Sequence, residues 1–503
     1  MLLRSILLIF AATAANGARI LGVFPFPSRS HTILGSALLR ELASRGHEVT
    51  MISPFPLKNP PPNYNDVYLD GLLEMRNERM KVFMSPNSST LSKIGYTYDI
   101  LRILNDAVIE NKNLQDFLAT KPKFDVAVQM LFMNEALLGI ADAVNATPIA
   151  FSLIGGNAIL NYFHGNPSPY AYVPHVATTF KDSMSFWQRV LNTLVALLGD
   201  MFAYLLMVPY QKSILQKHFP NAPPFEELLD NVDLTLVNSH FMTETPRPYL
   251  TNFIQIGGFH LHEKQHLPDD LQTYFNGSKH GVIYFSLGTN VKCEELKPST
   301  IESILHAFSK TKYDVLWKFD GTLPYNPKNV KISKWLPQKA ILAHPKTVAF
   351  ITHGGFGSIT EAIFHGVPMI VIPFFADQQK NGEGSAQHGF AIQLQLKDIS
   401  EISLSTAIEE ITGNSMYRDR IRSASDIFKN QPMNPMEKAV FWVEHIVKHK
   451  GAKHMKIKKM PWYQYMLLDV FAFILTILSV FFLFIYLVIK LISSLIKRKV
   501  KIQ

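Results

Sequence analysis

The chain has 503 residues, 47% of them apolar, and a formal net charge of +9. This length exceeds one ordinary domain and predicts two domains with additional segments. Much of the basic excess lies in clusters beside an apolar C-terminal run, which indicates membrane flanks and argues against nucleic-acid binding. The single cysteine, Cys293, excludes an intramolecular disulfide.

The first 17 residues have the pattern of a secretory signal peptide. Arg4 precedes the apolar stretch 6–15, and small residues stand before the expected cleavage site after Gly17. A buried first strand is the alternative interpretation. Sequons at Asn87 and Asn276 are expected glycosylation sites in a secretory protein.

The longest apolar run lies near the other end. Residues 470–489 carry no charge, and about 20 residues suffice to cross a bilayer core of roughly 30 Å. We predict a juxtamembrane segment at 448–466, a transmembrane helix at 467–490 and a cytosolic basic tail at 491–503; a buried core helix is the alternative. Lysines flank both ends of the run, so the signal peptide decides the orientation, which is single-pass type I with lumenal domains.

The basic tail carries a short address-like motif. Lys499 and Lys501 stand five and three places from the C-terminus, as in the dilysine signals that retrieve proteins to the endoplasmic reticulum. This spacing predicts residence in the endoplasmic reticulum membrane.

Two stretches in which strands and helices alternate predict two doubly wound α/β domains, an N-terminal domain at 18–260 and a C-terminal domain at 261–447. In the first stretch the expected strands are 20–24, 48–52, 126–129 and 148–153, and the expected helices are 32–44 and 134–144. In the second, a strand at 281–288 is followed by a helix at 297–310 and strands at 313–319, 348–352 and 369–373.

Residues 186–210 are unusually apolar, but Arg189 and Asp200 fall within them. A charge near the bilayer centre costs about 3 kcal/mol. We therefore expect a helix that lies on the membrane or covers an acceptor pocket, rather than a second span.

The segment 350–378 has the features of an anion site. Gly354, Gly355 and Gly357 follow an apolar strand and let the backbone approach a ligand closely. A helix expected to begin near Ser358 directs its free N–H groups and positive dipole end at the turn, which suits phosphate. A glycine-rich helix start that binds nothing is the alternative.

Polar side chains surround this turn. His353 can add a hydrogen bond to phosphate, and Glu361, one turn into the helix, can accept hydrogen bonds from ribose hydroxyls. Asp377 and Gln378, after the next strand, pair a carboxylate with an amide and suit the hydroxyls of a sugar.

These positions together resemble the signature of the UDP-glycosyltransferase family, of the UDP-glucosyl- and UDP-glucuronosyltransferase type. The resemblance extends along nearly the whole chain. Residues 335–338 resemble the family's WxPQ turn, 286–289 its first C-domain loop, and 431–454 with 461–465 the stretch before the anchor in insect membrane-anchored members. It implies the GT-B architecture, in which two Rossmann-like doubly wound domains face a cleft, here with one C-terminal transmembrane helix.

The resemblance also implies roles for individual residues. Trp335 would stack on uracil, Gln338 would bond to uracil, and Glu361 would bond ribose. Ser286, His353 and Ser358 would contact the diphosphate, and Asp377 and Gln378 would hold the sugar. The UDP-sugar is a co-substrate, no cofactor or metal is implied, and the sequence shows no metal-ligand cluster. The implied donor-binding set is Ser286, Gly288, Thr289, Trp335, Gln338, His353, Gly355, Gly357, Ser358, Glu361, Asp377 and Gln378.

His31 is the candidate catalytic base. It follows the first strand, at the sheet edge where open α/β folds bind ligands, and it matches the family's base. In the family a carboxylate stabilises the charged form of this base. The corresponding position is Met130, which cannot do so, and Glu135 is a candidate substitute.

These features predict an inverting transferase that moves a hexose, glucose if the insect likeness holds, from a UDP-sugar to a small lipophilic acceptor in detoxification or conjugation. With Met130 in place, an active enzyme would favour acidic acceptors such as phenols, carboxylic acids or thiols. The alternatives are a catalytically weakened UDP-sugar-binding protein or partner subunit, and a membrane protein that only binds or transports lipophilic ligands. The acceptor and any homo- or hetero-oligomer are left open.

Overall fold

The computed structural model describes residues 17–83, 90–156, 158–175, 177–263, 266–289, 296–374, 377–458 and 460–500. The signal-peptide prediction for 1–17, apart from its last residue, lies outside the described residues, as do the Asn87 sequon and Lys501 of the dilysine signal. The chain forms one compact unit up to Met455 and a second unit from Lys456 onward.

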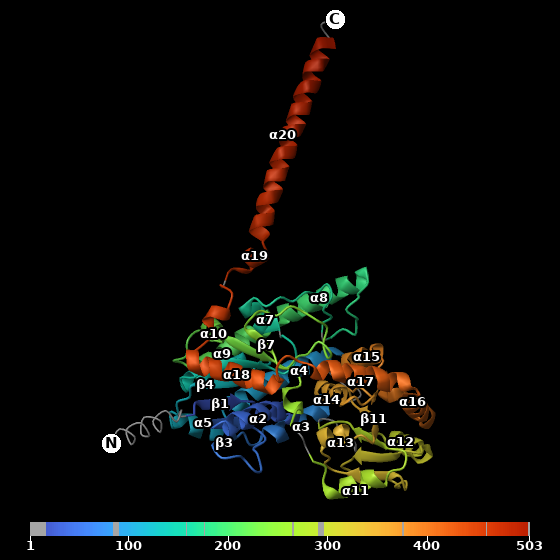
Figure 1. Cartoon of the computed structure of the whole chain (residues 1–503). Helices are drawn as coiled ribbons and strands as arrows, with labels where there is room; N and C mark the ends of the chain where they lie inside the picture. Colours follow the sequence, from blue (N-terminus) through green and yellow to red (C-terminus); the bar gives the residue numbers. More distant parts are fainter. Residues whose placement is uncertain are drawn as a thin grey trace, which may run out of the picture. The chain divides into compact units, whose positions relative to one another are not determined.

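The first unit contains two wholly parallel sheets (Figure 1). The first sheet has the order β3-β2-β1-β4-β5-β6-β7. Strands β1 to β3 are added toward one edge and strands β4 to β7 toward the other, so the strand order reverses between β1 and β4. Its strands are β1 (Arg19–Val23), β2 (Glu48–Ser53), β3 (Tyr64–Tyr68), β4 (Val126–Met130), β5 (Thr147–Ser152), β6 (Leu234–Val237) and β7 (Phe253–Gln255).

Apolar helices cover both faces of this sheet, which explains why β4 is buried along its whole length. The helices of this domain are α2 (Arg29–Ser44), α3 (Leu72–Phe83), α4 (Thr90–Ile109), α5 (Lys112–Ala119), the 3-10 turn η1 (Glu135–Leu137), α6 (Leu138–Ala143), α7 (Ala158–His164), α8 (Phe186–Phe202), α9 (Val208–His218) and α10 (Phe225–Asp230).

The second sheet repeats the arrangement with the order β10-β9-β8-β11-β12-β13. Its strands are β8 (Val282–Ser286), β9 (Asp314–Lys318), β10 (Val330–Ser333), β11 (Thr347–Thr352), β12 (Met369–Val371) and β13 (Ala391–Gln393). Its helices are α11 (Asp269–Gly277), α12 (Pro298–Lys310), α13 (Gln338–Ala343), α14 (Phe356–His365), α15 (Gln378–Gln387), α16 (Glu401–Gly413) and α17 (Ser415–Lys429).

The predicted strands are confirmed within a few residues, and so is the prediction of two doubly wound sheets. The helix predicted at 134–144 is instead η1 followed by α6. The strands β3, β6, β7, β10 and β13 were not predicted, and neither were the helices α3 to α5, α7, α9 to α11, α13 and α15 to α17.

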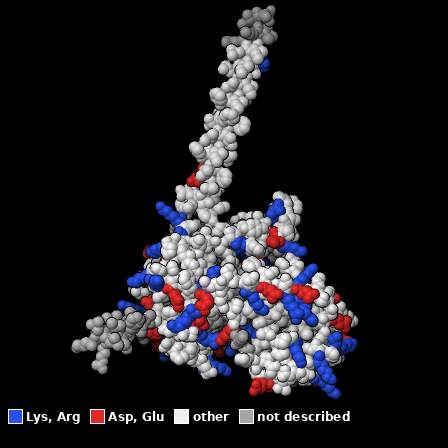
Figure 2. Space-filling model, viewed as in Figure 1, with Lys and Arg blue, Asp and Glu red and all other residues white. Residues whose placement is uncertain are grey.

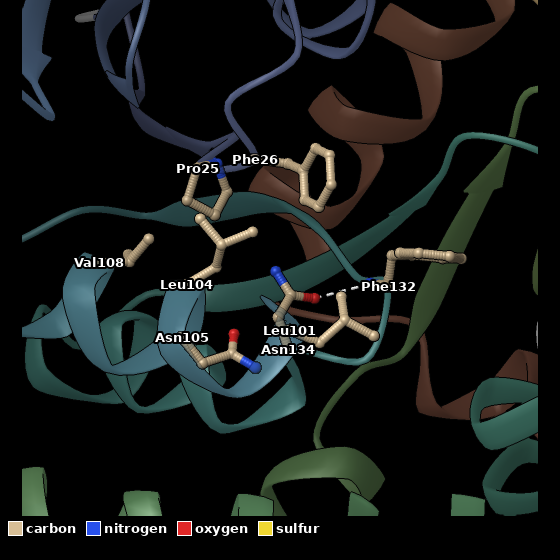
Figure 3. A pocket seen from close by; sticks show the side chains of 8 residues that line it. All are labelled: Pro25, Phe26, Leu101, Leu104, Asn105, Val108, Phe132 and Asn134. Carbon is tan, nitrogen blue, oxygen red and sulfur yellow. Dashed lines mark hydrogen bonds between the residues drawn. The ribbon is translucent and has the colours of Figure 1, made fainter. Parts of the chain in front are cut away.

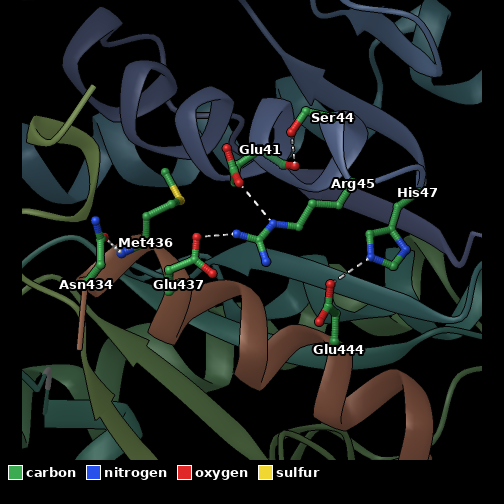
Figure 4. Close-up of polar contacts among 8 residues, drawn as sticks. All are labelled: Glu41, Ser44, Arg45, His47, Asn434, Met436, Glu437 and Glu444. Carbon is green, nitrogen blue, oxygen red and sulfur yellow. Dashed lines mark hydrogen bonds and ion pairs between the residues drawn. The ribbon is translucent and has the colours of Figure 1, made fainter. Parts of the chain in front are cut away.

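The last helix of the first unit, α18 (Pro435–His449), returns to the N-terminal domain. Although most of it falls within the 261–447 range assigned to the C-terminal domain, its apolar face joins the core beside α2. Figure 4 shows the polar rim of this contact, where Arg45 pairs with Glu437 and His47 Nε2 lies 3.3 Å from a Glu444 carboxylate oxygen. The core residues of α18 are Ala439, Val440, Val443 and Ile446.

Helix α8 presents an exposed apolar stripe. Asn192 and Ala196 face inward, whereas Trp187 and Leu198, on the outward stripe, are 75% and 64% exposed. Asp200, which argued against a second span, accepts a hydrogen bond from the Tyr170 hydroxyl. By length and composition alone, the helical stretch 186–218 could cross a membrane.

The second unit contains α19 (Trp462–Tyr465) and α20 (Leu468–Val500). An 18-residue window within residues 468–497 of α20 has a mean hydropathy of 2.9 and no buried positions, and Figure 2 shows the helix almost free of charged side chains over most of its length. The predicted apolar C-terminal helix is therefore confirmed, with a length that suffices to cross a bilayer.

Candidate active site

The glycine-rich turn lies between β11 and α14. β11 ends at Thr352, and α14 begins at Phe356, two residues before the predicted start at Ser358. Gly355 occupies the N-cap position and has no side chain to satisfy the first N–H groups of the helix. Gly357 has open space where a Cβ would project. The remaining N–H groups of this helix N-terminus could receive an anion, and the anion site itself stays a prediction.

His353 fills the space that two glycines leave. A Cβ at Gly288 would lie 2.6 Å from Cε1 of His353, and a Cβ at Gly355 would lie 2.5 Å from its Nε2. Burial, assisted by the charge of Lys318, lowers the pKa of His353 to about 4. The imidazole is therefore neutral near pH 7 and can donate one N–H to a phosphate oxygen.

A lysine that was not predicted lies beside this turn. Lys318 is the last residue of β9, and its Nζ donates a hydrogen bond to the carbonyl oxygen of Gly288 over 2.8 Å. The Gly288 N–H in turn donates to Ser286 Oγ over 3.2 Å, while the next residue, Thr289, is exposed. A cation, a neutral imidazole and a helix N-terminus around one turn suit a diphosphate. A basic residue at the carboxyl end of a buried strand is the signal that could have identified Lys318.

Gln338 links the predicted nucleoside-binding residues. Its Nε2 donates to Glu361 Oε2 over 2.7 Å and to Ser358 Oγ over 3.2 Å. Its Oε1 accepts from the Tyr284 hydroxyl over 3.4 Å. Burial raises the pKa of Glu361, and the bond from Gln338 opposes that shift. The structure thus brings Gln338, Ser358 and Glu361 together, and it adds Tyr284, which was not predicted.

Trp335 lies where the two domains of the first unit meet. Its side chain is 50% exposed, and the guanidinium carbon of Arg29 lies 4.4 Å from the ring centroid. Arg29 belongs to the first turn of α2, two residues before His31. This cation–π contact couples the predicted uracil-stacking residue to the helix that carries the candidate base.

The sugar-binding prediction falls on the start of α15. Asp377 is its N-cap residue, and its Oδ2 accepts a 2.6 Å hydrogen bond from Asn381, which also donates to the Gly354 carbonyl oxygen. Burial raises the pKa of Asp377, and the Phe356 N–H is among the groups that oppose this. Gln378 is buried, and its Oε1 accepts from the Phe374 N–H, so part of its amide supports the turn itself. Asn381 was not predicted.

His31 lies in the first turn of α2, although the sequence placed it in a loop. Its ring centroid is 5.0 Å from that of Phe26. Its Nδ1 is buried and has no hydrogen-bond partner within the described part of the chain. Burial, and secondarily the charge of Arg76, lowers the pKa of His31 to about 4. The ring is therefore neutral at physiological pH, as a general base requires.

The structure describes both residues that the sequence analysis considered for the carboxylate position beside His31. Met130 ends β4 and packs in the apolar core that includes Phe24 and Phe151. Glu135 is fully buried, both its oxygens lack hydrogen-bond partners among the described residues, and burial raises its pKa to about 7. Its neighbours in η1 belong to the core on the other face of the sheet. No hydrogen bond or ion pair joins Glu135 to His31 among the described residues, so its role as a substitute for the missing carboxylate stays a prediction.

A small apolar pocket opens beside the Phe26 loop that leads to His31 (Figure 3). Side chains of α4 form one wall, and Phe132 and Asn134, after β4, form another. Both polar atoms of the Asn134 side-chain amide have hydrogen-bond partners. Oδ1 accepts from the Phe132 N–H, and Nδ2 donates to the Met130 carbonyl oxygen. The lining residues are Pro25, Phe26, Leu101, Leu104, Asn105, Val108, Phe132 and Asn134.

Comparison with known proteins identifies relatives over nearly the whole chain. Residues 21–503 match the family model described as UDP-glucoronosyl and UDP-glucosyl transferase. UDP-glucosyltransferase 2 of Dactylopius coccus is 33% identical over 494 residues, which cover 93% of this chain and 92% of that protein. UDP-glucuronosyltransferase 2C1 of Oryctolagus cuniculus is 33% identical over 471 residues, which cover 89% of this chain and 93% of that protein.

Solved structures show the same fold at lower identity. The structure of TcCGT1 in complex with UDP superposes with a TM-score of 0.56 and 16% identity, and covers 86% of this chain and 99% of that one. The calicheamicin glycosyltransferase CalG4 gives a TM-score of 0.55 and 18% identity, and the match covers 86% of this chain and 99% of that one. At these identities the match establishes the fold alone.

The Gln338–Glu361 pair generates a binding prediction. Glu361→Ala should weaken UDP binding by about 10- to 100-fold, because it removes a ribose acceptor and leaves Gln338 without its shortest hydrogen bond. Isothermal titration of the detergent-solubilised chain with UDP measures the effect. Glu409→Ala, at an exposed position of α16, is the matched control and should bind UDP like the unchanged protein. Equal affinities for both variants would show that Glu361 does not contact the nucleotide.

Proposed function

Because the chain belongs to the UDP-glycosyltransferase family, we propose that it transfers glucose from UDP-glucose to small lipophilic acceptors in a conjugating, detoxifying reaction. The observation that carries the donor half is the turn at 353–357, where His353, Lys318 and the N-terminus of α14 surround one anion site. The glucose assignment draws on the insect relative named a UDP-glucosyltransferase.

The proposed reaction is a single displacement that inverts the anomeric carbon. The acceptor hydroxyl attacks that carbon, its proton passes to His31, and the bond to the UDP oxygen breaks. Because Nδ1 of His31 is buried, we assign proton uptake to Nε2. The negative charge that develops on UDP is stabilised by the N–H groups of α14 and by Lys318.

The acceptor half of the proposal draws on the pocket beside Phe26, whose volume of about 20 Å³ is close to that of one water, so an acceptor has to widen it. Its wall of leucine, valine and phenylalanine side chains favours an apolar acceptor. The Phe26 ring contacts both this pocket and the His31 ring, so an acceptor bound there would place a polar group next to the base.

The unpartnered Nδ1 of His31 sets the expected substrate preference. A protonated His31 imidazole gains no carboxylate hydrogen bond at Nδ1 among the described residues, so His31 is a weak base. Acidic acceptors such as phenols, carboxylic acids and thiols need less help from a base than aliphatic alcohols do. A UDP-sugar-binding protein with little turnover, serving as a partner subunit, is the second candidate, favoured by the same observation.

The catalytic prediction concerns His31 and Met130. The unchanged enzyme should glucosylate phenols faster than aliphatic alcohols, and His31→Ala should lower the phenol rate by about 100-fold. Met130→Asp should raise the rate on alcohols by about 10- to 100-fold, because a carboxylate would stabilise the imidazolium. Product formation from UDP-glucose and UDP-glucuronic acid, with both acceptor types, measures these rates.

The pH dependence of the rate separates stabilisation of the His31 imidazolium from a change of packing at position 130. The neutral form of His31 is the active one, so the rate should stay constant at neutral pH and fall only as the pH approaches about 4. Met130→Asp raises the pKa of His31 and should move the acid limb to higher pH, whereas Met130→Asn should not. UDP binding without transfer to any acceptor would favour the partner-subunit candidate.

We also propose that the domains lie in the lumen of the endoplasmic reticulum, with α20 as a type I anchor. The support is the signal-peptide pattern, the dilysine-like tail and an exposed Asn276 at the end of α11. Endoglycosidase treatment of the expressed chain should remove a glycan that is absent from Asn276→Gln. An unchanged mobility for both proteins would place this sequon outside the glycosylating compartment, or leave it unused, and would remove this support.

The apolar stripe of α8 is proposed to lie on the bilayer surface. In vesicles whose lipid chains carry bromine, Trp187 should be quenched because it is exposed on that stripe. Comparing the full chain with Trp187→Phe isolates its fluorescence from that of the other tryptophans. Quenching of this component by aqueous iodide alone would instead favour a helix that covers the acceptor pocket from the solvent side.

A further inference from the structure

One cluster of metal-ligand side chains lies outside the residues that bind the donor or carry the base. Asp106 of α4, Glu110 just after α4 and His218 at the end of α9 place one ligand atom each within 4.8 Å of one another. Asp106 and Glu110 are four residues apart, and the Glu110 N–H donates to the Asp106 carbonyl oxygen, so both carboxylates project from the same side of α4.

The distances within the cluster fit metal ligands better than a hydrogen-bonded pair. Nε2 of His218 lies 3.7 Å from Asp106 Oδ1 and 3.7 Å from Glu110 Oε1. Hydrogen bonds between nitrogen and oxygen span about 2.7–3.2 Å. Two ligands of one tetrahedral zinc ion, each about 2.0–2.1 Å from the metal, lie about 3.3 Å apart. A small contraction would therefore bring the imidazole nitrogen to ligand spacing from each carboxylate oxygen, and all three ligand atoms already lie within 4.8 Å of one another.

The imidazole supplies an independent indication of a missing ligand. Nε2 of His218 is buried and has no hydrogen-bond partner in the described part of the chain, and the side chain is 12% exposed. An imidazole nitrogen turned toward two carboxylates without reaching either is arranged as a metal ligand is. The Tyr210 hydroxyl lies 3.0 Å from the other carboxylate oxygen of Asp106 and 2.7 Å from the Arg102 carbonyl oxygen, so its single proton is shared between the two and it borders the cluster as second-layer partners of metal sites do.

We propose that Asp106, Glu110 and His218 form a zinc site, completed by water in the fourth position. One imidazole with two carboxylates suits zinc or manganese, whereas calcium and magnesium prefer all-oxygen sites. Lys217 Nζ now lies 2.9 Å from Glu110 Oε1, so binding requires the ammonium group to move to solvent. The Lys217 side chain is 60% exposed and can move freely.

The site would act on the acceptor pocket through α4. Leu101, Leu104 and Val108 line the pocket from one face of this helix, and Asp106 and Glu110 lie on the opposite face at 100° per residue. A metal ion held by both α4 and α9 would cross-link the pocket wall to its neighbouring helix. It would be a positioning element, remote from the transfer chemistry.

Zinc content tests the proposal without any activity measurement. The full-length chain in detergent is stripped with EDTA, equilibrated with buffered micromolar Zn²⁺ and analysed by mass spectrometry of the metal. The expected result is one zinc ion that is lost in His218→Ala and in Glu110→Gln. Because the Glu110 side chain is 53% exposed, its substitution does not threaten folding, and a thermal scan checks this.

Two further variants distinguish zinc bound at this cluster from zinc bound elsewhere on the chain. His445→Ala removes the central member of a second histidine group, whose rings at His449 and His454 lie 4.5 and 5.9 Å away, and should keep the zinc ion. Lys217→Ala should tighten zinc binding by roughly tenfold, because it removes the competing cation. A zinc ion lost in His445→Ala and kept in His218→Ala, or no bound zinc in the unchanged chain, would overturn the proposal.

Discussion

The donor site depends on the absence of side chains at two positions around His353. β8 and β11 are neighbours, with Ser286 paired to Thr352, so the loops that follow them leave the sheet side by side. Gly288 belongs to one loop and Gly355 to the other, and a Cβ at either would displace the imidazole. The same two glycines bring the main chain of both loops, the Lys318 ammonium and the first turn of α14 to one place. A single steric constraint thus positions groups from three strands.

The features that the sequence predicts well are those set by a few neighbouring residues. Apolar strands buried on both faces, and a glycine turn between a strand and a helix, are visible as short patterns. Edge strand β3 has the polar sequence YNDVY, which resembles a loop. This polarity fits its place at the sheet edge, where only its first residue is buried. β7 and β13, with three residues each, are too short to show a pattern.

The remaining parts of the site depend on contacts that join distant segments. Arg29 meets Trp335 across more than three hundred positions of sequence, and Asp106 approaches His218 from another helix. No periodicity or spacing in the sequence signals such pairs. Glu135 shows a related limit, because its position in the chain suggested a partner for His31, and its neighbours in η1 belong to the core cluster that does not contain Met130.

The two halves of the site differ in how completely they are built. The donor side has a hydrogen-bonded network in which Gln338 joins Ser358, Glu361 and Tyr284. On the acceptor side, His31 is buried against Phe26, with Nδ1 unpartnered and Met130 in the apolar core. Low polarity around a base favours its neutral form but gives nothing to the charged form that must follow. Nucleotide recognition and proton transfer therefore have separate determinants in this chain.

The return of α18 to the N-terminal domain determines which domain is tethered. The chain passes through the C-terminal domain and re-enters the core around α2 before it continues into α20. The polypeptide link to the anchor therefore starts from the acceptor-side domain, and the nucleotide-side domain is inserted between two connections. The order of the chain therefore gives the N-terminal domain both polypeptide connections to the C-terminal domain, and α20 continues from the second of them.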